Sequence, residues 1–187
     1  KKHHIQLFTG ETVVKIEKES QIVKTDKGRE VSYDKLIIAT GSTPFILPVS
    51  GVDKEGVMAF RTIEDCHKII ETSQQYKKAV VIGGGLLGLE AARGLLNLGM
   101  DVNVVHIAEY LMERQLDSTA AKMLQKELEN QGMHFLLKKE TKEIIGESRA
   151  EGVRFTDGTE VEADLVVMAA GVRPNITLAK ESGMDTN

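Results

Sequence analysis

Cysteine is almost absent from this chain, because Cys66 is the only one in 187 residues. A single cysteine excludes an internal disulfide, a CxxC redox pair and a cysteine cluster for zinc or iron–sulfur. Tryptophan is absent and aromatic residues make up 4% of the chain, which argues against a base-stacking surface. The formal net charge of −4 also argues against nucleic acid, because phosphate backbones are bound by basic surfaces.

Long apolar runs are missing as well. The longest, such as Leu36–Ala39 and Leu165–Ala170, have the length of a strand, whereas a membrane-spanning helix needs roughly 20 residues. No signal-peptide apolar stretch follows the basic start at Lys1 and Lys2. With the lone thiol, these features predict a cytoplasmic protein that binds no membrane.

Glycine, by contrast, is frequent, with 17 residues against three prolines. Charged residues make up 28% of the chain and hydrophobic residues 41%, which indicates a globular protein. The length suits one ordinary domain, or one domain together with parts of another.

The first forty residues are patterned as β-structure. Thr12–Ile16, Gln21–Thr25 and Arg29–Tyr33 are strand-like, and turn residues separate them. Leu36–Ala39 is apolar on both faces, which is typical of a fully buried strand. Because these short strands alone would bury little surface, we expect this region to be part of a domain.

The rest of the chain is patterned as α/β structure. A connector over residues 45–77 contains a helix predicted from Thr62 to about Ser73. Parallel strands and helices are then predicted in alternation, at Ala79–Ile82, Leu86–Leu98, Val102–Val105, Asp117–Asn130, His134–Leu137 and Leu165–Ala169. An antiparallel β-meander precedes the last strand, with a hairpin turn at Thr156-Asp157-Gly158. The expected fold class is therefore α/β, with a Rossmann-like domain built on a parallel sheet.

A glycine motif stands where the first of these strands meets its helix. Gly83, Gly85 and Gly88 form GxGxxG, which in this position is typical of dinucleotide-binding proteins. Gly83 permits the tight turn, Gly85 lets the backbone approach a pyrophosphate, and Gly88 lets the helix pack closely on the strand. The helix start offers N–H groups and a positive dipole end to phosphates. The predicted site comprises Gly83, Gly84, Gly85, Leu86, Leu87 and Gly88. The alternative is a turn that is merely rich in glycine.

The residue that reads the adenosine ribose is normally an acid at the end of the second strand. That position holds His106, and Glu109 in the following loop could take the acid's role. No pair of basic residues follows the strand to bind a 2′-phosphate, and Arg114 is the nearest. The pattern favours NADH over NADPH, and leaves open that His106 is an ordinary strand-end histidine.

No catalytic side chain and no metal site are predicted. Glu90, in the first turn of the glycine-loop helix, either contacts the cofactor or simply complements the helix dipole. The histidines have no ligand-like spacing with acids or with Cys66. Hydride transfer needs no protein nucleophile, because the cofactors carry the redox chemistry.

Four stretches, in this order, resemble the pyridine nucleotide–disulfide oxidoreductase family of flavoproteins with two dinucleotide-binding domains. They are Leu36–Pro44, Phe60–Asp65, Val80–Ala92 and Val167–Asn175. The resemblance implies a partial FAD-binding domain at 1–44, a connector with a helix at 45–77, an NAD(P)H-binding domain at 78–171, and a return to the FAD domain at 172–187. It also implies that Glu90 and Gly171 lie near the nicotinamide. The residues that it places near FAD are Thr40, Gly41 and Ser42.

A narrower resemblance concerns Gly83–Gly99, Val104–His106 and Leu111–Asp117. These stretches are similar to the large subunit of bacterial NAD(P)H-dependent nitrite reductases, in which histidine also replaces the strand-end acid. That subfamily passes electrons from NADH to FAD and then through an iron–sulfur cluster to sirohaem, where nitrite becomes ammonia. The resemblance implies two partners, the remainder of the same polypeptide and a small nitrite reductase subunit. A homo-oligomer is compatible with the sequence, which does not itself indicate the oligomeric state.

The FAD fingerprint, the flavin-end motif and the cluster cysteines do not occur in the sequence. We therefore expect a segment of a longer polypeptide that is inactive alone. Two alternatives remain. One is another NADH:flavin reductase, such as a rubredoxin or ferredoxin reductase or an NADH oxidase. The other is a non-catalytic nucleotide-sensing domain, which would bind NAD without turnover.

Overall fold

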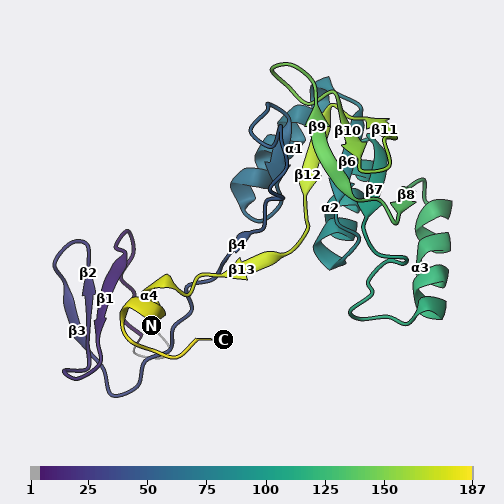
Figure 1. Cartoon of the computed structure of the whole chain (residues 1–187). Helices are drawn as coiled ribbons and strands as arrows, with labels where there is room; N and C mark the ends of the chain where they lie inside the picture. The colour runs from purple at the N-terminus through teal and green to yellow at the C-terminus, as the bar shows by residue number, and fades with distance from the viewer. Residues whose placement is uncertain (1–4, 187) are drawn as a thin grey trace. The chain divides into compact units, whose positions relative to one another are not determined.

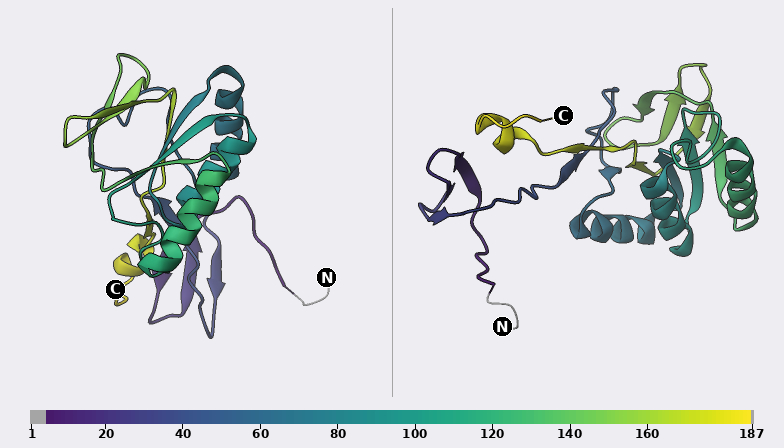
Figure 2. Two further views of the ribbon diagram at one scale, coloured as in Figure 1. Left: turned by 90° about the vertical axis from the view of Figure 1, so that its right-hand side faces the viewer. Right: turned by 90° about the horizontal axis from the view of Figure 1, so that it is seen from below.

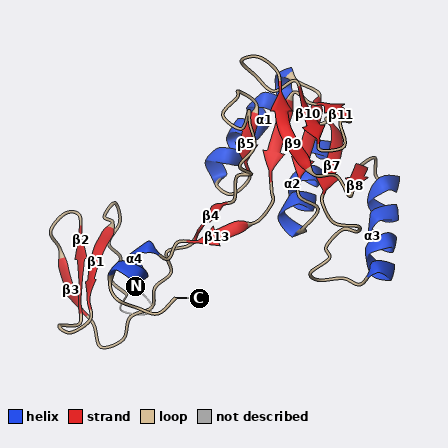
Figure 3. Ribbon diagram, viewed as in Figure 1, coloured by secondary structure: helices blue, strands red, loops and turns tan. Residues whose placement is uncertain are grey.

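The computed structural model describes residues 5–186, and the chain divides into two compact units. One unit joins the N-terminal part up to Ser42 with the C-terminal part from Pro174, and the other is Thr43–Arg173. Figure 1 labels the helices and strands, and Figure 3 distinguishes them by colour. Among residues 5–186, no helix is both long and apolar enough to cross a membrane.

The larger unit is built on a five-stranded parallel sheet in the order β5-β12-β6-β7-β8. The strands are β5 Val57–Ala59, β6 Lys78–Ile82, β7 Asp101–His106, β8 His134–Leu137 and β12 Leu165–Met168. The helices are α1 Ile63–Gln75, α2 Leu86–Asn97 and α3 Ser118–Asn130. Successive strands run from β6 to β8 on one side, and β12 lies on the other side of β6. The direction of winding thus reverses at β6, and ligands of doubly wound sheets bind at the carboxyl ends of strands at such a reversal.

Both faces of this sheet are covered. Ala79 and Val81 of β6 lie in a core with side chains of α1 and α2. Val80 and Ile82 lie in a second core with Phe155 and its neighbours in an antiparallel meander. The meander consists of β9 Thr141–Ile145, β10 Gly152–Phe155 and β11 Glu160–Glu162, in the order β11-β10-β9. The right-hand view of Figure 2 shows α1 and α2 on one face and the meander on the other. Burial on both faces explains the unbroken apolar runs in the strands, and the predicted α/β fold is confirmed.

The helices begin where the sequence predicted, because side chains cap two of them. The Thr62 hydroxyl accepts a hydrogen bond from the Asp65 N–H at 3.1 Å, and the Asp65 carboxylate accepts one from the Thr62 N–H at 2.8 Å. Asp117 caps α3 by accepting from the Ala120 N–H at 2.9 Å. α2 differs, because its N-cap residue is Gly85 and no side chain caps it.

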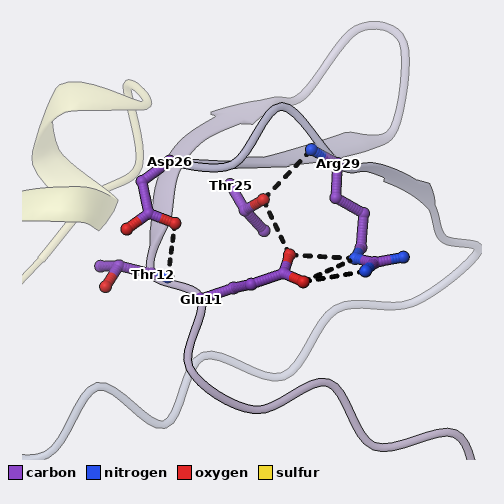
Figure 4. Close-up of polar contacts among 5 residues, drawn as sticks. All are labelled: Glu11, Thr12, Thr25, Asp26 and Arg29. Carbon is purple, nitrogen blue, oxygen red and sulfur yellow. Dashed lines mark hydrogen bonds and ion pairs between the residues drawn. The ribbon is translucent and has the colours of Figure 1, made fainter.

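The smaller unit contains an antiparallel sheet in the order β1-β2-β3 and a short helix α4. Their bounds are β1 Val13–Glu17, β2 Ile22–Thr25, β3 Glu30–Ser32 and α4 Thr177–Glu181. In Figure 4, the Arg29 guanidinium donates to both carboxylate oxygens of Glu11, with distances of 2.8 to 3.1 Å. The Thr25 hydroxyl also donates to Glu11, and Asp26 accepts from the Thr12 N–H. The hydrogen bond from Arg29 is the main cause that lowers the pKa of Glu11. These contacts fix the segment before β1 against the β2–β3 hairpin.

One predicted strand is wrong. Leu36–Ala39 is not a strand, and the Ile37 side chain is 90% exposed. A strand needs a neighbouring strand to pair with, and no described residue pairs with this segment. Two short strands occur instead at β4 Ser42–Pro44 and β13 Val172–Pro174, which form a two-stranded sheet.

Candidate functional site

The glycine turn connects the carboxyl end of β6 to α2. Gly83 has a φ of +129°, and a Cβ at this position would lie 2.3 Å from the Ala169 carbonyl oxygen. A Cβ at Gly88 would lie 1.8 Å from the Gly83 carbonyl oxygen. Packing within the protein therefore requires glycine at both positions, for the turn and for close helix–strand contact respectively.

Gly85 is different, because nothing in the protein requires it. Its backbone is extended, with φ −87° and ψ −174°, and a Cβ built here would meet no atom within 4 Å. The space beside it is open and lies at the N-terminus of α2. The first N–H groups of a helix have no partner within it and carry a partial positive charge. Since no side chain caps α2, Gly85 leaves room for an anion to reach these groups.

Gly84 is buried between the turn and the loop that follows β7. Its N–H donates to His106 Nδ1 at 3.1 Å, and its carbonyl accepts from the Met112 N–H at 3.0 Å. A Cβ on Gly84 would lie 2.7 Å from His106 Cγ and 2.7 Å from Leu111 Cδ2. Glycine is therefore needed here because the strand-end histidine and the loop pack directly against it.

His106 ends β7 and is 7% exposed. Its Nδ1 accepts from a backbone N–H, so in the neutral ring the proton is on Nε2, which donates to Glu113 Oε2 at 2.9 Å. Partial burial raises the pKa of Glu113, but hydrogen bonds from its own backbone N–H and from His106 lower it more. The pKa of Glu113 is therefore lowered overall. Both ring nitrogens of His106 are engaged within the protein.

Glu109 lies exposed in the same loop and contacts the end of β8. The Lys138 ammonium donates to its carboxylate at 2.7 Å, and this hydrogen bond is the main cause that lowers the pKa of Glu109. The Lys138 N–H donates to the Ala108 carbonyl, which joins the ends of β7 and β8. Arg114 is also exposed in this loop, and its positive charge contributes to the lowered pKa of Glu113.

The other predicted residues lie elsewhere. Glu90 is exposed on α2 and lines an apolar groove between α1 and α2. Gly171 follows β12, the neighbour of β6, and its carbonyl accepts from the Phe45 N–H at 2.9 Å. The residues Thr40, Gly41 and Ser42 belong to the smaller unit. Thr40 donates its hydroxyl hydrogen to the Asn175 carbonyl at 2.6 Å.

Three residues contribute to this site without having been predicted from the sequence. Glu113 and Met112 bind His106 and Gly84, and Lys138 pairs with Glu109. Glu113 lies within Leu111–Asp117, one of the stretches that resemble nitrite reductases. No rule of sequence spacing relates it to His106. Among residues 5–186, no group of His, Cys, Asp or Glu side chains could hold a metal ion.

The doubly wound parallel sheet, with a glycine turn at its reversal, defines a Rossmann-like α/β domain. The sequence matches the family model described as pyridine nucleotide-disulphide oxidoreductase over residues 1–187. The chain belongs to this family.

Two curated relatives come from Bacillus subtilis (strain 168). Nitrite reductase [NAD(P)H] is 64% identical over 185 residues, which cover 99% of this chain and 23% of the relative. The assimilatory nitrate reductase electron transfer subunit is 56% identical over 186 residues, which cover 100% of this chain and 24% of the relative. The chain thus spans about a quarter of the length of each.

A solved structure of a ferredoxin reductase from Rhodopseudomonas palustris is also similar. It matches with a TM-score of 0.89 and 29% identity, and the match covers 95% of this chain and 44% of that one. The similarity therefore extends to a protein named as a ferredoxin reductase, of which this chain matches less than half.

Proposed function

We propose that the chain is the NAD(P)H-binding segment of a flavin-dependent oxidoreductase that passes hydride from NADH to FAD, within a nitrite reductase that forms ammonia. The observation that carries this proposal is Gly85. An ordinary φ and open space around its absent Cβ leave no reason within the protein for glycine there. A pyrophosphate that approaches the N-terminus of α2 supplies that reason.

The residues divide the binding task among them. The turn from Gly83 to Gly88, with the N–H groups of Leu86 and Leu87, would hold the pyrophosphate. Glu109 would accept hydrogen bonds from the adenosine ribose, because both nitrogens of His106 are already engaged. Glu90 and Gly171 would lie toward the nicotinamide. When bound, the dinucleotide supplies the hydride and the flavin accepts it.

The smaller unit would be part of the FAD-binding domain, together with segments of a longer polypeptide. Its exposed apolar side chains support this, because Ile5, Leu7 and Ile37 are each at least 78% exposed. Thr40, Gly41 and Ser42 would lie near FAD. The iron–sulfur cluster and sirohaem would be held outside this chain, and a small nitrite reductase subunit would be the partner. The expected compartment is the cytoplasm.

The full-length protein tests this function directly. We expect anaerobic addition of NADH to bleach the flavin absorbance, and nitrite to restore it with formation of ammonia. The readouts are the visible spectrum and an ammonia assay. A flavin that stays oxidised under excess NADH would instead support a nucleotide-sensing role.

A second candidate is an NADH-dependent ferredoxin reductase, which the structural similarity to a ferredoxin reductase favours. The same reduced protein distinguishes the two. If a ferredoxin reoxidises the reduced flavin and nitrite is left unchanged, the result would favour the ferredoxin reductase over the nitrite reductase.

Nucleotide preference gives a further prediction. We expect NADH to bind more tightly than NADPH, because the Glu109 carboxylate would repel a 2′-phosphate. The Lys138 ammonium offsets part of this repulsion, so the preference should be at most about 1 kcal/mol, or roughly fivefold. Glu109→Gln keeps a hydrogen-bond acceptor and removes the charge, so the preference should fall toward unity. Both nucleotides would be titrated calorimetrically, with Glu147→Gln as a control at an exposed acid on another loop. An unchanged preference in Glu109→Gln would remove Glu109 from the ribose site.

A further inference from the structure

We infer that His106 is a positioning residue for the glycine turn, which it holds as a neutral imidazole oriented by Glu113. This inference rests on the proposed function, because it assumes that the turn binds the pyrophosphate of a dinucleotide. His106, at the end of β7, would thus have a role other than ribose binding.

The hydrogen bonds of Gly84 are the first argument. The N–H of Gly84 is held by His106 and its carbonyl by the Met112 N–H. Gly85, the residue next along the chain, is the one beside the open space. The backbone is therefore fixed immediately before the point where the ligand would approach, and a prearranged binding loop reduces the entropy lost on binding.

The packing around Gly84 is the second argument. His106 is 7% exposed and Leu111 is fully buried, and both lie where a Cβ of residue 84 would be. Met112 adopts a φ of +56°, in the left-handed region that residues other than glycine rarely occupy. Such a conformation persists only where surrounding contacts enforce it. The hydrogen bond from Met112 to the turn is one such contact.

The chemistry of the ring is the third argument. Nδ1 must be unprotonated to accept from the Gly84 N–H, so Nε2 carries the proton and donates to Glu113. A ring engaged in this way has no donor or acceptor left for ribose hydroxyls. Glu113 thus favours the tautomer with the proton on Nε2. In this tautomer Nδ1 is free to accept the Gly84 N–H, which holds the glycine turn in place.

Two substitutions distinguish the role of Nδ1 from that of Nε2 in the His106 ring. His106→Asn places an amide oxygen near the position of Nδ1, and so can still accept from Gly84 but cannot reach Glu113. His106→Gln extends toward the position of Nε2, and so can reach Glu113 but offers no acceptor to Gly84. His134→Gln is the matched control, because His134 is an exposed histidine at the start of β8.

The experiment measures NADH dissociation constants, and the KM and kcat of flavin reduction, in the full-length protein. We expect His106→Gln to weaken NADH binding and raise KM about tenfold, as loss of one hydrogen bond near a charged ligand predicts. His106→Asn should weaken binding no more than about threefold. The kcat at saturating NADH should be similar in both variants, because the ring touches no reacting atom.

Equal effects of the two substitutions, whether large or absent, would overturn the inference. If His106→Gln does not fold, Glu113→Ala replaces it, since this variant keeps the ring but frees its orientation. We then expect about a threefold weaker affinity, and an unchanged affinity would overturn the inference. Gly85→Val separates this result from the proposed function. If Gly85→Val and the wild-type protein bind NADH alike, the proposed function fails, whereas loss in Gly85→Val alone refutes only the role of His106.

Discussion

Gly85→Val is expected to weaken NADH binding by at least about 100-fold, equivalent to about 2.7 kcal/mol, while the protein still folds. The valine side chain would fill the space through which the pyrophosphate approaches the N-terminus of α2. It would meet no protein atom at its Cβ, and the φ of −87° suits any residue. Calorimetric titration of NADH would measure the loss, and circular dichroism would check the fold.

Gly94→Val is the matched control for this prediction. Gly94 lies inside α2, the helix that Gly85 precedes, and a Cβ there also meets nothing within 4 Å. The control therefore adds the same side chain to the same element without obstructing the turn, and valine has a slightly higher helix propensity than glycine. NADH affinity in Gly85→Val equal to that of the control would place the dinucleotide elsewhere.

Gly88→Ala is expected to damage the fold itself. The added methyl would lie 1.8 Å from the Gly83 carbonyl oxygen, which belongs to the backbone and cannot rotate away. Overpacking of this kind costs roughly 3 kcal/mol, so the thermal midpoint should fall by roughly 6 to 12 °C. Differential scanning calorimetry of the full-length protein would measure the shift.

Gly94→Ala is the control for stability. Alanine in an open helix position should stabilise the protein by about 0.5 to 1 kcal/mol, because it has the higher helix propensity. A midpoint of Gly88→Ala close to that of Gly94→Ala would mean that α2 moves away from β6 at little cost. The close helix–strand packing assigned to Gly88 would then be incorrect.

Much of the larger unit could be predicted from the sequence, because local patterns determine it. The apolar strand of β6 is buried on both faces, and the cap residues Thr62 and Asp117 begin α1 and α3 as predicted. The spacing of the glycines likewise predicts a tight turn at Gly83 and close helix–strand packing at Gly88, and the contacts of both residues agree with these roles. Each of these patterns is local in the chain, although the partners that bury β6 and crowd Gly83, among them Phe155 and Ala169, are distant in sequence.

The features that could not be predicted depend on contacts between distant residues. Leu36–Ala39 has the composition of a buried strand, but composition cannot supply the neighbour with which a strand must pair. For His106 the sequence left open a contact with the ribose and an ordinary strand-end histidine, because the direction of its ring depends on contacts with Gly84 and Glu113. The direction of a side chain at a strand end depends on its packing with distant residues, and a sequence motif does not specify that packing.

The contact between His106 and Glu113 also limits how nucleotide preference can be redesigned. Restoring the usual strand-end acid by His106→Asp would place a carboxylate near the position of Nδ1 and would remove the donor that Glu113 now has at Nε2. Two carboxylates with no donor between them would then face the same loop, and like charges repel each other. Positions 106 and 113 therefore form a coupled pair, and we expect either substitution to be tolerated better when the other accompanies it. Transplanting a ribose-binding acid from another branch of the family into this site thus requires at least two simultaneous changes.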